Sequence, residues 1–221
     1  MSPADILRTV DHTLLSPAAT REQIFLLCDE GIAYHTASVC LPPIYVREAA
    51  DYVQGAVPVC TVIGFPNGYS TTAAKCRETE EALRGGAAEI DMVLQLGWLK
   101  DRRFDEVLRE IREVKNVCGP HILKVIIETC LLTEEEKLRM CDIVSRSGAE
   151  FIKTSTGFSS GGATREDVAL LRAHSAPHVS VKAAGGIATL QDAEELLACG
   201  ASRLGTSRLI RLVQEADRVS D

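Results

Sequence analysis

Runs of β-branched and aliphatic residues alternate with helix-like segments from one end of this 221-residue chain to the other. Such alternation is typical of strand–helix units built around a parallel sheet. The expected strands are Val10–Leu14, Thr36–Cys40, Val57–Ile63, Glu89–Leu94, Leu123–Glu128, Phe151–Ser155, Ser180–Ala184 and Arg203–Thr206. The pattern therefore predicts eight such units.

Local signals mark where the helices between these strands begin and end. A hydroxyl residue followed three positions later by an acid or amide predicts a capping box at a helix start. These pairs are Thr20 with Gln23, Thr133 with Glu136, Thr164 with Asp167, and Thr189 with Asp192. Glycine favours the left-handed conformation that ends many helices, and the expected ends are Gly31, Gly86, Gly148 and Gly200.

Three of these glycines also suggest a common register. Five positions separate Gly86 from Asp91, Gly148 from Lys153, and Gly200 from Gly205. If every unit turns from helix into strand in the same way, these positions stand at similar height on the same face. We therefore expect the side chains of Asp91 and Lys153 to converge.

Eight units without a linker favour one closed (β/α)₈ barrel domain over residues 1–221, since such barrels run from about 200 to 250 residues. The alternative is an open doubly wound sheet with helices on both faces. The barrel is preferred because charged residues recur on several strands, and a closed interior can bring them together.

Composition excludes several classes of function. The net charge of −7 and the lack of a basic tract argue against nucleic acid as a partner. No apolar run is long enough to cross a membrane, and the start Met1-Ser2-Pro3-Ala4-Asp5 does not have the layout of a signal peptide, so we expect a cytoplasmic protein. The eight cysteines are scattered and are expected to be reduced, and the five histidines show no metal-ligand spacing.

Two lysines lie inside runs that otherwise read as buried strands, Lys153 in Phe151–Gly157 and Lys182 in Val179–Gly186. An unpaired ammonium is costly to bury, and two neighbouring cations favour loss of a proton. A lysine that is partly neutral near pH 7 is a nucleophile for carbonyl groups. The pair therefore indicates Schiff-base chemistry, whereas a lone strand lysine would be read as a structural cation.

Other ionisable residues in the strands support a shared polar site. Asp91, Lys124 and Asp11 each interrupt or begin an apolar run. Several such groups in sheet-forming segments are better explained by one functional site than by independent accidents. Asp11 and Lys124 are expected in this interior charge network, either orienting Lys182 or Asp91 or as plain structural pairs.

Small and glycine-rich segments follow the last three strands, where barrels often bind phosphate through backbone amides. A glycine pair alone is more often a plain turn, but three such segments on neighbouring loops predict a phosphate site. Its expected residues are Thr156, Gly157, Gly185, Gly186, Gly205, Ser207 and Arg208.

Six ordered strings resemble the deoxyribose-phosphate aldolase family over nearly the whole chain. They are residues 10–15 (VDHTLL), 60–66 (CTVIGFP), 89–93 (EIDMV), 123–129 (LKVIIET), 151–158 (FIKTSTGF) and 181–186 (VKAAGG). The resemblance implies a barrel enzyme without metal or cofactor that reversibly cleaves 2-deoxy-D-ribose 5-phosphate into D-glyceraldehyde 3-phosphate and acetaldehyde. It also implies a homodimer.

The resemblance assigns roles to three residues. Lys153 corresponds to the Schiff-base lysine, Lys182 to the neighbouring cation that favours its neutral form, and Asp91 to the acid/base partner. Some family members have lysine where this chain has Phe158 and serine where it has Arg208. If that lysine holds phosphate in those relatives, we expect Arg208 to supply the charge here.

Two other functions fit the same residues less well. One is another phosphosugar barrel, such as a transaldolase-like lyase or a decarboxylase that uses lysine and aspartate without a covalent intermediate. The other is a non-catalytic phosphosugar sensor. Cys40, at the end of an expected strand, is either exposed to reactive aldehydes or a buried thiol.

Overall fold

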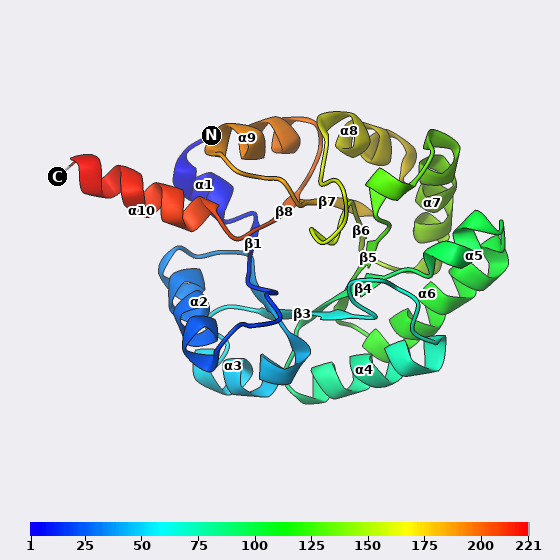
Figure 1. Cartoon of the computed structure of the whole chain (residues 1–221), viewed down its shortest axis with the longest axis horizontal. Helices are drawn as coiled ribbons and strands as arrows, with labels where there is room; N and C mark the ends of the chain where they lie inside the picture. Colours follow the sequence, from blue (N-terminus) through cyan, green and yellow to red (C-terminus); the bar gives the residue numbers. More distant parts are fainter. Residues whose placement is uncertain (221) are drawn as a thin grey trace.

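A computed structural model describes residues 1–220 and contains one closed barrel of eight parallel strands in sequence order (Figure 1). The barrel closes because β1 pairs with β8, with Val10 opposite Leu204. The strands are β1 Val10–Thr13, β2 Ser38–Leu41, β3 Val59–Ile63, β4 Glu89–Val93, β5 Ile122–Ile126, β6 Phe151–Lys153, β7 Ser180–Ala184 and β8 Arg203–Thr206. The predicted barrel is confirmed, and the open sheet is excluded.

Helices form a ring around the barrel (Figure 1). They are α1 Pro3–Leu7, α2 Arg21–Ala33, α3 Val46–Val53, α4 Thr72–Arg84, α5 Leu96–Lys100, α6 Phe104–Cys118, α7 Glu134–Ser147, α8 Arg165–His174, α9 Leu190–Ala198 and α10 Leu209–Ser220, with 3₁₀ turns η1 Pro43–Tyr45 and η2 Thr129–Leu131. None of the helices in residues 1–220 is long and apolar enough to cross a membrane.

The capping boxes predicted at Thr20, Thr133 and Thr189 are formed. At Thr164 only half of the box is present, since its hydroxyl accepts from the Asp167 amide. The Asp167 carboxylate instead pairs with Lys137 of α7 at 2.5 Å. A side chain in a neighbouring helix has therefore taken the place of the local cap.

The glycine signals were right at three helix ends and wrong at Gly31. Gly148 caps α7 with φ +91°, and Gly86 and Gly200 take positive φ just beyond their helices. Gly31 lies inside α2, and His35 takes the left-handed conformation instead. A Cβ atom at Gly31 would lie 2.4 Å from Cγ1 of Val39, so this glycine allows α2 to pack closely on β2.

The strands divide the buried residues into two regions, because successive side chains point to opposite faces. On β4, Ile90 and Met92 belong to the apolar layer between barrel and helices. Glu89 and Asp91 lie on the other face, inside the barrel, where they meet side chains from other strands. The fold therefore gathers interior charges from separate segments of the chain.

Candidate active site

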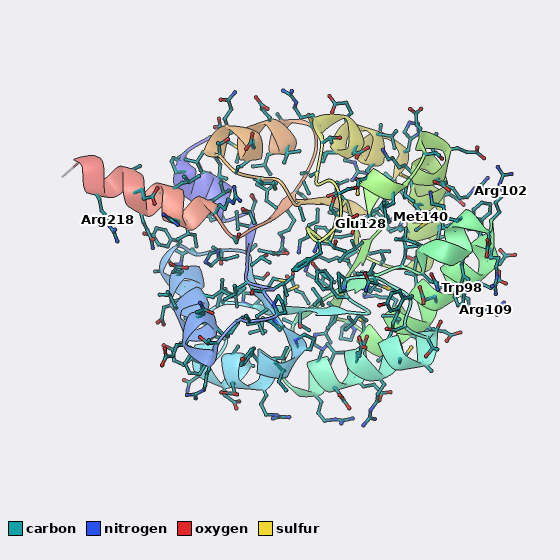
Figure 2. All side chains as sticks on the ribbon, viewed as in Figure 1. Trp98, Arg102, Arg109, Glu128, Met140 and Arg218 are labelled. Carbon is teal, nitrogen blue, oxygen red and sulfur yellow. The ribbon has the colours of Figure 1, made fainter. Side chains whose placement is uncertain are left out.

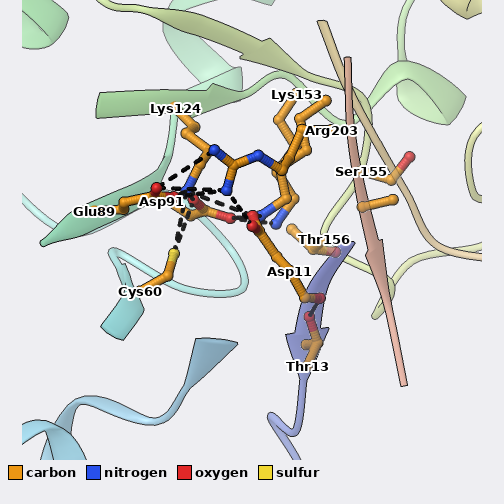
Figure 3. A network of polar contacts seen from close by, with 12 residues as sticks. Asp11, Thr13, Cys60, Glu89, Asp91, Lys124, Lys153, Ser155, Thr156 and Arg203 are labelled. Carbon is orange, nitrogen blue, oxygen red and sulfur yellow. Dashed lines mark hydrogen bonds and ion pairs between the residues drawn. The ribbon is translucent and has the colours of Figure 1, made fainter. Parts of the chain in front are cut away.

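Asp91 contacts three lysines inside the barrel (Figure 3). Its Oδ2 accepts from Nζ of Lys153 at 2.8 Å and from Nζ of Lys182 at 2.6 Å, while Oδ1 accepts from Nζ of Lys124 at 2.8 Å. Asp91, Lys124 and Lys182 are fully buried, and the Lys153 side chain is 4% exposed. The predicted convergence of Asp91 and Lys153 is confirmed.

Strand register explains why these side chains meet. Lys153 of β6 stands directly opposite Lys182 of β7, and Asp91 of β4 stands opposite Lys124 of β5. Neighbouring parallel strands lie about 4.8 Å apart, so residues in register on one face are within reach of each other. As a result, Lys153 and Lys182 both donate to Oδ2 of Asp91.

Below these residues, Asp11 joins a second layer of contacts. It pairs with Lys182, with Lys124 at 3.5 Å and with Nη1 of Arg203 at 2.6 Å, and it accepts from the Ser38 hydroxyl at 2.7 Å. Glu89 pairs with Lys124 at 2.6 Å and with Arg203 at 3.2 Å. We call Asp11, Glu89, Asp91, Lys124, Lys153, Lys182 and Arg203 together the charge cluster.

Glu89 and Arg203 were not among the residues predicted for the site. A signal for both was present in the sequence, because each lies two positions before a predicted interior residue, Asp91 or Gly205. Residues two apart on a strand share a face. Cys60 was missed as well, and its Sγ lies 3.3 Å from both Asp91 Oδ1 and Lys124 Nζ.

Burial opposes the charged forms of Asp91 and Lys182, but the neighbouring charges outweigh it. The ammonium groups of Lys124, Lys153 and Lys182 overcome burial and hold the pKa of Asp91 well below its ordinary value. In the same way Asp11 and Asp91 overcome burial and raise the pKa of Lys182 above its ordinary value. Asp91 is therefore a carboxylate and Lys182 a cation at neutral pH.

The cluster contains four basic and three acidic side chains, so full ionisation leaves one surplus positive charge. Lys124 and Lys182 each pair with at least two carboxylates. Among the described residues, the only carboxylate paired with Lys153 is Asp91. Lys153 is thus the least compensated basic group of the cluster, and it faces a cavity.

That cavity, of about 530 Å³, opens at the C-terminal ends of the strands, and Lys153 lies in its wall. We call it the C-terminal cavity. All seven residues predicted for phosphate binding line it, namely Thr156, Gly157, Gly185, Gly186, Gly205, Ser207 and Arg208. Asp91, Lys182, Asp11 and Lys124 are not part of the wall. The cavity therefore brings the Lys153 amine and a candidate anion site together.

Two glycines in the cavity wall are required by geometry. Gly186 has φ +78°, which glycine adopts without strain and other residues rarely do. A Cβ atom at Gly205 would lie 2.9 Å from Cβ of Ala184 and 3.2 Å from Cε of Lys182. Gly205 therefore leaves room for the Lys182 side chain beneath the cavity.

The sequence does not reveal Glu128 as part of the site, because its apolar run predicts a strand over Leu123–Glu128, whereas β5 ends at Ile126. The Glu128 backbone takes the left-handed conformation with φ +53°, and its side chain is buried (Figure 2). Its Oε2 accepts from the Thr156 hydroxyl at 2.5 Å, and the Thr156 amide donates to Oε1 at 3.3 Å. The same hydroxyl accepts from the Phe158 amide at 3.0 Å. Glu128 thus fixes the loop that follows β6.

Phe158 and Arg208 lie on opposite loops of the cavity wall. The Phe158 ring is half exposed and contacts the Phe65 ring edge-on, with centroids 5.3 Å apart. Arg208 is exposed, and none of the carboxylates whose side chains the structure describes forms an ion pair with its guanidinium. Its charge is available to an anion in the cavity.

Two groups of side chains have the spacing of metal ligands, Cys40 with Cys60 and Asp91, and Asp11 with Cys60 and Glu89. The carboxylates of both groups already contact the ammonium or guanidinium groups of the cluster. A metal ion would have to displace these cations, so the residues do not fit a resident metal. All eight cysteines are free thiols, and Cys40 is buried.

Comparison with known proteins places these residues in a family. A model of the family described as "DeoC/LacD family aldolase" matches residues 6–206. A protein of Streptococcus pyogenes serotype M4 named deoxyribose-phosphate aldolase is 56% identical over 221 residues, which cover 100% of this chain and 99% of the relative.

Solved structures agree with the fold. A structure from Coccidioides immitis has a TM-score of 0.95 at 41% identity and covers 98% of this chain and 87% of its own. A deoxyribose phosphate aldolase from Aeropyrum pernix, described as tetrameric, has a TM-score of 0.90 at 32% identity and covers 99% and 93%. The resemblance seen in the sequence is confirmed, and the chain belongs to the DeoC/LacD family of aldolases, which makes it a lyase.

Proposed function

We propose that the protein is a class I aldolase that reversibly cleaves 2-deoxy-D-ribose 5-phosphate into D-glyceraldehyde 3-phosphate and acetaldehyde. The observation that carries this proposal is Lys153, the least compensated base of a buried charge cluster, in the wall of a cavity lined by candidate phosphate-binding groups. The name of the Streptococcus pyogenes relative supports the same substrate.

The reaction begins when the neutral amine of Lys153 attacks the aldehyde carbon C1 of the open-chain sugar. Loss of water from the resulting carbinolamine gives a protonated imine. As the C3 hydroxyl loses its proton, the electrons of the C2–C3 bond move into the imine, which becomes an enamine. Glyceraldehyde 3-phosphate leaves, C2 takes a proton, and water hydrolyses the new imine to release acetaldehyde and the free lysine.

Lys182 and Asp91 serve this step from beneath the cavity. Lys182 keeps its proton because Asp11 and Asp91 stabilise the cation, so its positive charge favours the neutral form of the nearby Lys153 amine. Asp91 lies outside the cavity wall. As acid/base partner it therefore exchanges a proton with the sugar through an intervening water or lysine.

The phosphate would lie at the opposite side of the cavity from the charge cluster. Backbone amides of Gly185 and Gly186 and the Ser207 hydroxyl are hydrogen-bond donors suited to its oxygens, and Arg208 adds a positive charge. Holding this end fixes the distance between the aldehyde and Lys153, which is how binding energy remote from the reacting atoms assists catalysis.

A coupled assay for glyceraldehyde 3-phosphate tests the activity. The purified protein should release it from deoxyribose 5-phosphate without added metal and in the presence of a chelator. A requirement for a divalent ion, or no release at all, would contradict the proposal. Sodium borohydride added with acetaldehyde should inactivate the enzyme by reducing the imine, whereas a decarboxylase without a covalent intermediate would survive this treatment.

The predicted homodimer stays a prediction for this chain. Light scattering coupled to size-exclusion chromatography measures its mass in solution directly. A mass of two chains is the expected result, and a mass of four would match the assembly described for the Aeropyrum pernix relative.

A further inference from the structure

We propose that Glu89 and Arg203 are positioning residues that set the charge balance of the cluster, and through it the pH at which Lys153 becomes reactive. This inference rests on the proposed Schiff-base function. It assigns a part in the reaction to two side chains at the end of the cluster remote from the cavity, neither of which lies in the cavity wall.

Continuous ion pairs connect these two residues to Lys153. Arg203 contacts Asp11 at 2.6 Å, Asp11 contacts Lys182, and Lys182 and Lys153 bind the same oxygen of Asp91. Glu89 enters the cluster on a second side, through Lys124 at 2.6 Å, which in turn contacts Asp91 at 2.8 Å. Because the side chains between them are buried, a change of charge at either residue affects Lys153 with little screening by solvent.

The charge count makes Lys153 the group that responds. Four basic side chains face three carboxylates, and a surplus charge in a buried cluster is costly. Arg203 does not lose its proton in proteins, and Lys124 and Lys182 are compensated by at least two carboxylates each. Release of the Lys153 proton brings the cluster to neutrality.

Among the described residues, two thiols also lie beside the cluster, Cys40 of β2 and Cys60 of β3. Burial raises the pKa of the Cys60 thiol well above its ordinary value, so it adds no charge at neutral pH. A hydrogen bond with Cys60 lowers the pKa of the Cys40 thiol. A Cys40 thiolate would cancel the surplus charge, so Cys40→Ala is a control. An unchanged midpoint is expected, whereas a fall in the midpoint would show that Cys40 is charged and that the count of one surplus charge is wrong.

The test is the dependence of kcat/KM on pH, whose acid limb reports the essential base of the free enzyme. Arg203→Met removes the surplus charge, so the midpoint of this limb should rise by about one pH unit, a tenfold loss of reactive enzyme on the limb. Glu89→Gln removes one negative charge and so leaves two surplus positive charges in the cluster. The midpoint should then fall by about one pH unit. The double variant restores a surplus of one and should return the midpoint to that of the unchanged protein.

Charge-conserving variants separate this effect from a merely structural one. Arg203→Lys and Glu89→Asp disturb the same contacts while keeping the count, so they should leave the midpoint in place even where they lower activity. If Arg203→Met does not fold, Glu89→Gln and the two conservative variants still decide the matter. Equal midpoints in all folded variants, or midpoints that follow activity and not charge, would overturn the proposal.

Failure of this inference can be told apart from failure of the proposed function. Acetaldehyde and borohydride should leave an ethyl group on Lys153 in the unchanged protein whatever the variants do. If that adduct forms while the midpoints stay together, only the charge-balance proposal is wrong. If no adduct forms, the Schiff-base function fails first and the charge-balance proposal fails with it.

Discussion

Two groups of buried ions in this protein differ in a way that separates a site from a scaffold. The charge cluster lies inside the barrel, whereas Lys75 of α4 and Glu110 of α6 form a fully buried pair outside it, 2.9 Å apart. Lys75 also donates to the Val93 carbonyl at 2.8 Å, and the Gln95 amide donates to Glu110 at 3.0 Å. That pair ties two helices to the end of β4.

Charge balance and access distinguish the two regions. In the outer pair burial dominates, so it lowers the pKa of Lys75 and raises the pKa of Glu110, and one positive charge meets one negative charge. In the cluster the neighbouring charges dominate and one cation is in surplus. A buried ion pair is therefore not enough to indicate an active site. The proposed site differs from the outer pair by its surplus charge and by the cavity beside Lys153.

The largest expected effect is that of Lys153→Met. Removing the nucleophile should lower kcat/KM by roughly four orders of magnitude or more, while inorganic phosphate should raise the melting temperature of the variant and of the unchanged protein by the same amount. Both are read from the coupled assay and a thermal melt. Retained cleavage of deoxyribose 5-phosphate would contradict the role of Lys153. A cellular response to the phosphosugar that the substitution leaves unchanged would favour the sensor function.

The matched change in the outer pair is Lys75→Met. It leaves Glu110 as an uncompensated buried carboxylate, so the free energy of unfolding should fall by about 3 to 5 kcal/mol, with kcat unchanged for the molecules that remain folded. Urea unfolding measures the loss. Lys75→Met combined with Glu110→Leu should recover most of it, and a large fall in kcat with normal stability would blur the distinction between the two regions.

Glu128→Ala tests whether the loop after β6 is held from the end of β5. Loss of the acceptor for Thr156 should raise KM for deoxyribose 5-phosphate about tenfold, in keeping with a charged hydrogen bond worth about 1.5 to 3 kcal/mol. Labelling by acetaldehyde and borohydride should continue. Thr156→Ser keeps the hydroxyl and is the control; if it is impaired as much as Glu128→Ala, the hydrogen bond is not what matters.

The smallest expected effect is that of Arg208→Ala. An exposed arginine contributes a screened charge, so KM for the phosphorylated sugar should rise severalfold, with little change for unphosphorylated deoxyribose. Steady-state kinetics on both sugars make the comparison. Equal effects on the two sugars would reject Arg208 as the source of the phosphate charge.

Strand order and the contact between Asp91 and Lys153 could be predicted because both depend on local patterns. The bounds of β7 and β8 match the expected strands, and the convergence of Asp91 with Lys153 follows from strand register. Gly31 was mistaken for a helix end because its role depends on Val39, a contact that only the folded chain supplies.

Other residues were missed because their partners are distant in the sequence. Arg203 meets Glu89 across 114 positions, and Lys75 meets Glu110 across 35. The two-residue spacing to Gly205 and Asp91 places Arg203 and Glu89 on the interior face, but no local pattern reveals which residues pair. Charged residues outside the barrel gave no guide, since many lie on the outer surface, such as Arg102 in the turn after α5 and Arg109 on α6 (Figure 2). Packing between elements decides which charges are buried.

The most direct test of the account is to find which lysine carries the substrate carbon. The protein is treated with acetaldehyde and borohydride, digested, and mapped by tandem mass spectrometry. The account predicts an ethyl group on Lys153, with Lys75, Lys124 and Lys182 unmodified. An ethyl group on Lys182 in place of Lys153, or none on any lysine, would contradict it.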